Sequence, residues 1–299
     1  MTDATSGTPW ASGRFDGRRG PRRLLFGSMH EDESIERRVF RDRRRIFCIA
    51  SAGCTAMALS PDHDVVAVDV NPEQVAYAAG RFGGRSAQRG AAERRMAALR
   101  ALAPLAGWAS RRLSAFLELD DPAEQLGFWR RHLDTRRFRT GLDLLLSKPV
   151  LLLDYGSPFL RSLPPGFGRV LRGRLERGFA LHPNRGNQYV RALLLGELPK
   201  ASAPVRAARI RLVAADAAAF LEKEPPGSFD GFALSNVLDG AGAEYRRRLL
   251  LAVRRAAAPG ARAVLRSFST ASDPADAVLA AEDRSMLWGA VRVAPAEVL

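Results

Sequence analysis

Short apolar runs alternate with segments of helical periodicity along most of the chain. Five runs have the length and composition of buried strands, and polar or turn residues follow each: 45–50, 64–70, 209–216, 229–236 and 261–268. Residues 243–258 have a helical pattern that Pro259 and Gly260 should end. A late run, 287–293, could add an edge strand. Strands that alternate with helices predict an α/β fold with a doubly wound, mostly parallel sheet.

The middle of the chain has a different pattern. Turn-forming prolines separate several amphipathic helical stretches there, and Leu126, Trp129 and Leu133 share one expected helix face. The start of the chain is rich in Gly, Ser, Pro and Arg without periodicity, so we expect a flexible tail. The expected parts are this tail, the first part of a core, a helical insertion that forms an acceptor or lid region, and the second part of the core: 1–23, 24–84, 85–204 and 205–299.

The first two expected strands carry the clearest sign of chemistry. Run 45–50 ends in the small-residue turn 51–53, and run 64–70 contains Asp69 near its end. Such a turn lets backbone amides approach a ligand, and an acid after the second strand can accept both ribose hydroxyls. The turn holds a single glycine, Gly53, and Asp69 lies 16 residues beyond it, which favours S-adenosylmethionine over a dinucleotide. An ordinary buried βαβ unit, with Asp69 capping the next helix, has the same pattern.

Polar residues that end the expected strands should meet at one edge of the sheet. In a doubly wound sheet the ligand lies across the carboxyl ends of the strands. Asp216 could accept a hydrogen bond from an adenine amino group beside the amide of Ala217, or could simply cap the helix that follows. The expected cofactor-binding residues are Ser51, Ala52, Gly53, Asp69, Asn71, Asp216, Ala217, Ser235, Asn236 and Glu31.

A more specific pattern is spread over six stretches of the chain. They are LFGSMHED at 25–32, CIASAGC at 48–54, AVDVNPEQ at 67–74, HPNRGNQY at 182–189, LSNVLD at 234–239 and EDRSMLWG at 282–289. These stretches resemble the S-adenosylmethionine:diacylglycerol 3-amino-3-carboxypropyltransferases of betaine-lipid synthesis and their uncharacterised bacterial relatives. The resemblance implies a Rossmann-like class I S-adenosylmethionine-dependent transferase core. It also implies aminocarboxypropyl transfer to an acceptor hydroxyl, with diacylglycerol as the model acceptor and methylthioadenosine as the second product.

Attack by an acceptor hydroxyl requires a general base. The candidates are Asp239, His182 and His30, and Asp239 comes first because it lies three residues beyond Asn236 at the end of the fourth expected strand. A lone histidine can equally be a structural hydrogen-bonding group. The residues expected on the acceptor side, together with His182, are Asn184, Asn187 and Tyr189, although Asn and Tyr could also satisfy loop backbone.

An acid that many methyltransferases carry at the end of the first strand is absent here, where the sequence reads Ile49-Ala-Ser. The amino acid part of the cofactor should therefore be held differently. We expect a helix over 28–42, and we expect His30, Glu31 and Asp32 on it to approach the cofactor ammonium or the acceptor. Alternatively, the two acids only favour the N-terminal end of that helix.

Composition narrows the class of protein. With 299 residues and 46% hydrophobic content the chain can build a sizeable core, which excludes disorder throughout. Cys48 and Cys54 are the only cysteines and have no histidines at metal spacing, so we expect reduced thiols and no metal site. No apolar run approaches the roughly 20 residues of a membrane span, and the start lacks a signal-peptide core. We expect a cytoplasmic protein, either soluble or peripheral at the inner membrane face.

The net charge of +14 is concentrated in one segment. Residues 83–208 contain 22 Arg or Lys against 10 Asp or Glu. This basic surface could face anionic lipid headgroups or nucleic acid phosphates, or could be a solvated face without a ligand. The expected partners are a glycerolipid or another hydroxyl acceptor and an anionic membrane surface, with nucleic acid a weaker expectation. Two alternatives remain: a methyltransferase acting on a small molecule or nucleic acid, and a non-catalytic cofactor-binding or lipid-binding module.

Overall fold

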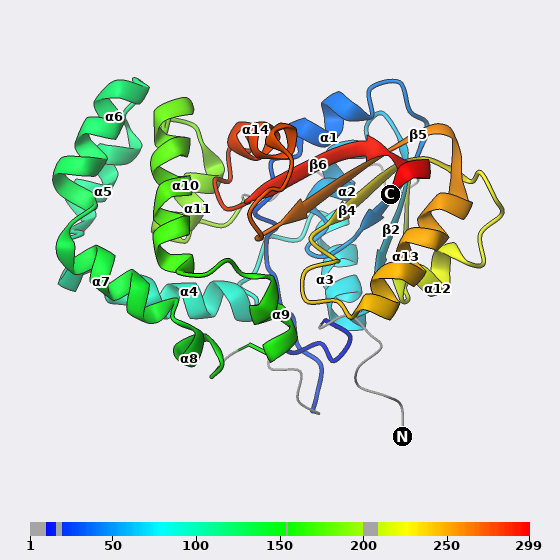
Figure 1. Cartoon of the computed structure of the whole chain (residues 1–299), viewed down its shortest axis with the longest axis horizontal. Helices are drawn as coiled ribbons and strands as arrows, with labels where there is room; N and C mark the ends of the chain where they lie inside the picture. The colour runs from blue at the N-terminus through cyan, green and yellow to red at the C-terminus, as the bar shows by residue number, and fades with distance from the viewer. Residues whose placement is uncertain (1–9, 16–19, 154, 200–208) are drawn as a thin grey trace.

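The computed structural model describes residues 10–15, 20–153, 155–199 and 209–299. Within this part of the chain, a six-stranded sheet is flanked by helices (Figure 1). The strands are β1 (Arg45–Ile49), β2 (Asp64–Asp69), β3 (Ile210–Ala214), β4 (Phe229–Ser235), β5 (Ala257–Ser267) and β6 (Ala290–Pro295). Their order in the sheet is β3-β2-β1-β4-β5-β6. The first five are parallel and β6 is antiparallel to β5, which confirms the predicted α/β fold with a mostly parallel sheet.

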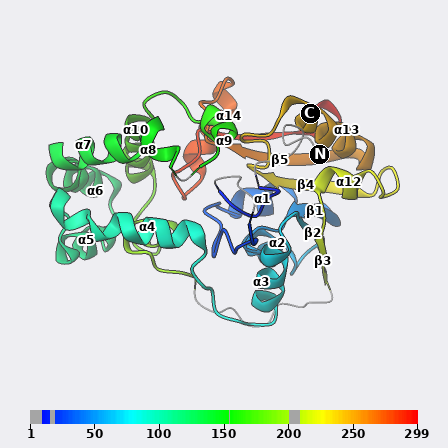
Figure 2. The same ribbon diagram turned by 90° about the horizontal axis from the view of Figure 1, so that it is seen from below.

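Helices cover both faces of the sheet, as Figure 2 shows. Phe47 and Phe232 point toward the helices on one face, whereas Ile46 and Val65 pack against those on the other. Each buried side chain of this size contributes about 1.5–3 kcal/mol, which explains why the central strands are apolar throughout. The helices around the sheet are α1 (Ser34–Val39), α2 (Cys54–Leu59), α3 (Pro72–Phe82), α12 (Ala217–Leu221), α13 (Ala243–Ala256), α14 (Pro274–Glu282) and the short turn η4 (Ala296–Val298).

The expected insertion is helical and has a core of its own, built around Trp129, Phe116 and Phe179. Met286, from the loop between α14 and β6, belongs to the same core and joins this segment to the sheet. Its elements are α4 (Ala91–Ala101), η1 (Ala103–Ala106), α5 (Ser110–Leu117), α6 (Pro122–Phe128), η2 (Trp129–Leu133), α7 (Arg136–Leu145), α8 (Lys148–Leu151), α9 (Ser157–Ser162), α10 (Phe167–Leu181) and α11 (Gln188–Leu195). The expected boundary at 204 and 205 lies outside the described residues.

Two expected boundaries need correction. The helix predicted over 28–42 is only α1, so His30, Glu31 and Asp32 lie in the loop before it. The helix predicted over 243–258 is α13, which ends at Ala256, and Pro259 and Gly260 lie inside β5, which begins at Ala257. The pairing of β4 with β5 shifts register between Phe229 and Gly231, and such an irregularity accommodates a proline that cannot donate to a neighbouring strand.

Within the expected flexible tail 1–23, the described residues 10–15 pack against the fold. Phe15 is buried, and its ring packs against Phe26 at a centroid distance of 5.4 Å. Trp10 packs against Phe159 of α9 at 5.3 Å. These aromatic contacts bury enough apolar surface to hold residues 10–15 against the fold. As for membrane crossing, no helix in the described ranges combines the length and the apolar composition that it requires.

Candidate functional site

A cleft lies at the carboxyl ends of the parallel strands, where the strand order reverses between β1 and β4. In α/β sheets this is the position at which ligands bind. The cleft encloses about 620 Å³, including the part that opens to solvent. Six of the expected cofactor-binding residues line it: Ser51, Asp69, Asn71, Ala217, Ser235 and Asn236. The fold therefore brings together polar side chains from the ends of β1, β2 and β4, with Ala217 after β3 beside them.

Asp69 is held rigidly at the end of β2. One carboxylate oxygen accepts a hydrogen bond from the backbone amide of Ser51 at 3.0 Å, and the other accepts one from the amide of Asn71 at 2.8 Å. Burial raises the pKa of Asp69 to about 6, although both amide donors oppose that rise. The ionised carboxylate thus faces the cleft with its orientation fixed and with lone pairs left to accept further hydrogen bonds.

Two serines in the cleft have strained backbones. Ser51 follows β1 with φ of 42°, and Ser235 ends the neighbouring strand β4 with φ of 53°. A side chain in this left-handed region costs about 1–2 kcal/mol, so the surrounding structure must impose it. Gly53 completes the turn with φ of 81°, and a Cβ there would lie 2.7 Å from the Phe82 ring. Strain on both sides of the reversal point is typical of a functional site.

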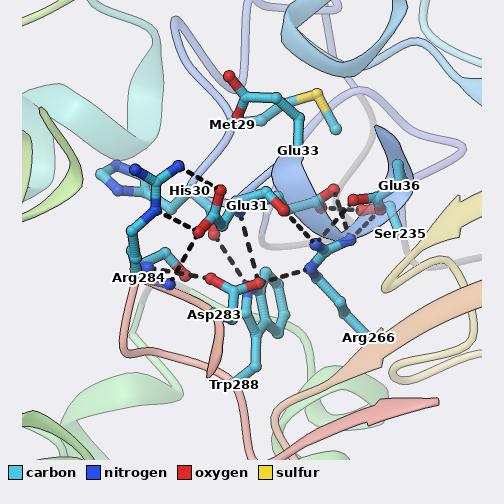
Figure 3. Close-up of polar contacts among 12 residues, drawn as sticks. Met29, His30, Glu31, Glu33, Glu36, Ser235, Arg266, Asp283, Arg284 and Trp288 are labelled. Carbon is cyan, nitrogen blue, oxygen red and sulfur yellow. Dashed lines mark hydrogen bonds and ion pairs between the residues drawn. The ribbon is translucent and has the colours of Figure 1, made fainter. Parts of the chain in front are cut away.

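A buried ionic cluster lies behind Ser235 (Figure 3). The Ser235 hydroxyl donates a hydrogen bond to the Glu31 carboxylate, and the fully buried Arg266 guanidinium lies 3.5 Å from Glu31. Arg266 also contacts Glu36 and lies 2.9 Å from Asp283. Burial raises the pKa of Glu31 to about 7, against the opposing effect of Arg266. Glu31 therefore reaches the cleft only through Ser235, where we had expected direct contact with the cofactor.

The candidate bases Asp239 and His30 have different surroundings. Asp239 is buried and accepts hydrogen bonds from the Ser267 hydroxyl at 2.6 Å and from the Phe268 amide at 2.9 Å, so it ties the end of β4 to the end of β5. The backbone carbonyl of His30 accepts a bond from the Trp288 indole, and burial lowers the pKa of its imidazole. Neither Asp239 nor His30 is among the described residues that line the cleft.

The residues expected on the acceptor side form bonds within the helical segment and between it and the residues near α1 and α14. His182 Nε2 lies 2.7 Å from the carbonyl oxygen of Ala281. Asn187 caps α11, because its side chain accepts from the amide of Tyr189 at 3.0 Å. None of these four residues is among the described residues that line the cleft: His182, Asn184, Asn187 and Tyr189. The contacts of Asn184 and Asn187 match the alternative in which polar loop residues satisfy backbone groups, whereas the Tyr189 hydroxyl donates to the Glu33 carboxylate.

Asp216 caps the helix that follows it, which was the alternative to adenine binding. Its side chain accepts a hydrogen bond from the amide of Ala219 at 2.9 Å and so caps α12. The Arg248 guanidinium lies 3.8 Å from the same oxygen. Ala52 and Gly53 shape the turn, and Ala52 offers its carbonyl to Arg81 at 2.8 Å. Ala217, next to Asp216, is the member of this pair that lines the cleft.

Residues that the sequence did not single out complete the cleft. Gln74 accepts a hydrogen bond from the amide of Leu25 at 2.9 Å and donates one to the carbonyl of Phe26 at 2.8 Å. All three line the cleft, together with Trp10 and Tyr245. Gln74 and Leu25 fall within the family-like stretches, which was the available signal for them. Trp10 carried no such signal, because it lies in a segment without periodicity.

Two further questions about the site are whether it could bind a metal and whether the chain resembles known proteins. In the ranges that the structure describes, no three His, Cys, Asp or Glu side chains are grouped so that they could hold a metal ion. The geometry supports an α/β, Rossmann-like sheet with a ligand cleft at its reversal point. Comparisons with models of known families, with curated proteins and with solved structures found no match to this chain.

Proposed function

We propose that the cleft binds S-adenosylmethionine and that the chain folds as the Rossmann-like core of a class I S-adenosylmethionine-dependent transferase. The observation that carries this proposal is the position of Asp69, a carboxylate at the end of β2 that backbone amides orient into the cleft. Such a carboxylate is suited to accept hydrogen bonds from both ribose hydroxyls. Leu25 and Val68 line the same space and offer an apolar surface to an adenine ring.

We further propose that the reaction transfers the 3-amino-3-carboxypropyl group to a hydroxyl, with diacylglycerol as the favoured acceptor. Four of the family-like stretches, 25–32, 48–54, 67–74 and 234–239, contribute residues to the cleft, and this supports the proposal. In the reaction, the acceptor oxygen forms a bond to the γ carbon of the methionyl chain. The carbon–sulfur bond breaks, its electron pair stays on sulfur in methylthioadenosine, and the hydroxyl proton passes to a base.

Glu31 is our choice for that base, acting through Ser235. Asp239, His182 and His30 are not among the described residues that line the cleft, whereas the Ser235 hydroxyl lines it and donates to the Glu31 carboxylate. A pKa of about 7 lets Glu31 accept a proton at neutral pH. Glu31→Gln should lower turnover by roughly 10²–10⁴-fold, the usual contribution of a general base, and should leave cofactor affinity unchanged. Unchanged turnover would exclude this role.

Cofactor binding is tested by calorimetric titration of the purified chain with S-adenosylmethionine. Asp69→Asn should weaken binding about 10- to 100-fold, because charge-assisted hydrogen bonds contribute about 1.5–3 kcal/mol. Asp64→Asn is the matched control, since Asp64 is exposed at the opposite end of the same strand. Absence of binding by the unaltered chain, or equal losses in both variants, would contradict the proposed site.

The product distinguishes the transferase from its alternatives. The chain is incubated with S-adenosylmethionine and diacylglycerol vesicles, and the nucleoside product is identified by mass. Methylthioadenosine together with an aminocarboxypropyl lipid is the expected result. S-adenosylhomocysteine would indicate a methyltransferase instead, and cofactor binding without consumption would indicate a non-catalytic module.

A further inference from the structure

Exposed leucines gather on adjoining elements of the helical segment. Leu144, at the end of α7, is 63% exposed, and Leu152 and Leu153, just after α8, are 53% and 77% exposed. Three more exposed leucines lie on α4, between α4 and η1, and on η1: Leu99, Leu102 and Leu105. Helix α7 contacts both η1 and α8, and Figure 2 shows α4, α7 and α8 on the face seen from below. Single exposed leucines are normal, but a group on adjoining elements marks a contact surface.

A hollow opens beside these leucines, between α7 and α8 on one side and α9 and α10 on the other. It encloses about 800 Å³, including its open part. Its apolar lining consists of Leu146, Leu151, Leu160, Leu163 and Phe167. The lining of the hollow is thus partly apolar and partly polar. Its apolar part and the leucines beside it would lose contact with water if a nonpolar phase covered them.

The surroundings of the hollow are basic. Lys148 and Arg169 line it, and both are exposed. The one acid in its lining, Asp143, lies 3.6 Å from Arg172, which offsets its charge. Further exposed arginines lie on α7 and α9: Arg136, Arg137, Arg139 and Arg161. Arg139 pairs with Asp134 at 2.7 Å, and the other cations carry the excess positive charge. Leucines flanked by an excess of cations are complementary to a surface with anionic headgroups outside and hydrocarbon inside.

The same corner adjoins the cleft. Leu160 of the hollow and Phe159 belong to one apolar cluster, and Trp10 packs against Phe159. Trp10 in turn lines the cleft. The hollow and the cleft are therefore linked through the contact of Phe159 with Trp10.

We propose that the corner formed by Leu144, Lys148, Leu152 and Leu153, which we call the leucine corner, docks on an anionic phospholipid bilayer. The leucines enter the interfacial layer, while Lys148 and Arg169 lie at the headgroups. Docking does not depend on the transferase chemistry, because it requires no cofactor. Failure of the proposed reaction and failure of docking are therefore separate results.

The test is sedimentation of the full chain with vesicles of phosphatidylcholine alone or mixed with phosphatidylglycerol. The unaltered chain should bind the mixed vesicles more tightly, and added salt should weaken this preference. Leu152→Ser combined with Leu153→Ser should weaken binding about 10- to 100-fold, given the free energy of burying two leucines in part. Lys148→Gln should weaken binding about fivefold, and only to the anionic vesicles.

Leu251→Ser is the matched control, because Leu251 on α13 is 53% exposed, as Leu152 is, but lies outside the corner. It should leave vesicle binding unchanged. Thermal unfolding of each variant verifies that it is folded. Three results would overturn the proposal: no binding of the unaltered chain to either vesicle, equal losses in the control and the corner variants, or binding of RNA in place of vesicles.

Discussion

The Ser235 hydroxyl donates a hydrogen bond to the carboxylate of Glu31, a residue 204 positions earlier in the chain. Ser235 ends β4 and lines the cleft, whereas Glu31 belongs to the buried cluster around Arg266. This single contact couples the strained backbone at the reversal point of the sheet to a titratable group. Both the chemistry of the cleft and the pH dependence of stability should follow from it.

Glu31 should make stability depend on pH near neutrality. Its pKa rises from 4.5 to about 7 on folding, so the folded state holds the proton more tightly than the unfolded state between these values. The free energy of unfolding should therefore fall by about 3 kcal/mol as the pH rises through this window. Glu31→Gln should lose this dependence. Urea denaturation of both chains across the window measures it, and parallel stability profiles would count against the assignment.

Asp69 should make cofactor affinity fall in mild acid. Burial raises the pKa of Asp69 to about 6, and only the ionised carboxylate offers charge-assisted hydrogen bonds to ribose. We expect affinity for S-adenosylmethionine to drop several-fold between about pH 7.5 and about pH 5. Calorimetric titration at both pH values measures the drop, and the Asp69→Asn chain should lack it. A drop of the same size in that variant would point to another group.

Gly53→Ala should destabilise the turn of the cleft by about 2–4 kcal/mol. The substitution adds a Cβ at positive φ and forces it against Phe82. Gly173→Ala is the control, since a Cβ at that position within α10 meets no atom within 4 Å. It should be neutral or slightly stabilising, as expected for alanine in a helix. Thermal unfolding compares the two, and similar behaviour would mean that the turn is not strained.

Arg266→Met should cost about 3–5 kcal/mol, because it leaves Glu36 and Asp283 buried without their cation. The comparison is Arg248→Met. Arg248 pairs with Glu222 at 2.6 Å on the surface, where such a pair contributes about 0–1 kcal/mol. Chemical denaturation gives both values. A small effect at Arg266 would show that the cluster tolerates unpaired charge.

Much of the sheet could be predicted from local patterns. The residues that pair across β1 and β2, such as Phe47 and Val66, are apolar because helices cover both faces of the sheet. A short apolar run of that kind can be recognised from the local sequence alone. The link between Asp69 and Ser51 also follows from the motif, since the turn after β1 and the end of β2 lie side by side in every βαβ unit. The start of β5 could not be predicted, because a shift of register there depends on the neighbouring strand.

The acceptor side shows the opposite case. His182 and Tyr189 stand in a stretch that suggested chemistry, yet they bond Ala281 and Glu33, residues far away in the sequence. Trp10 stands in a stretch that suggested nothing, and it lines the cleft because Phe15 and Phe159 pack around it. A sequence motif shows which polar side chains are present, but it does not show which hydrogen-bond partners they have in the folded chain.

By itself, the sequence determined the order of strands and helices, the turn at Gly53 and the acid at Asp69, because these depend on backbone geometry and on the burial of nearby residues. Only the tertiary structure decided that Glu31 meets Ser235, that Asp216 caps a helix and that exposed leucines gather at the end of α7 and just after α8. Those relationships join segments that are distant along the chain, and they are set by how the layers pack together. Local patterns contain no information about that packing.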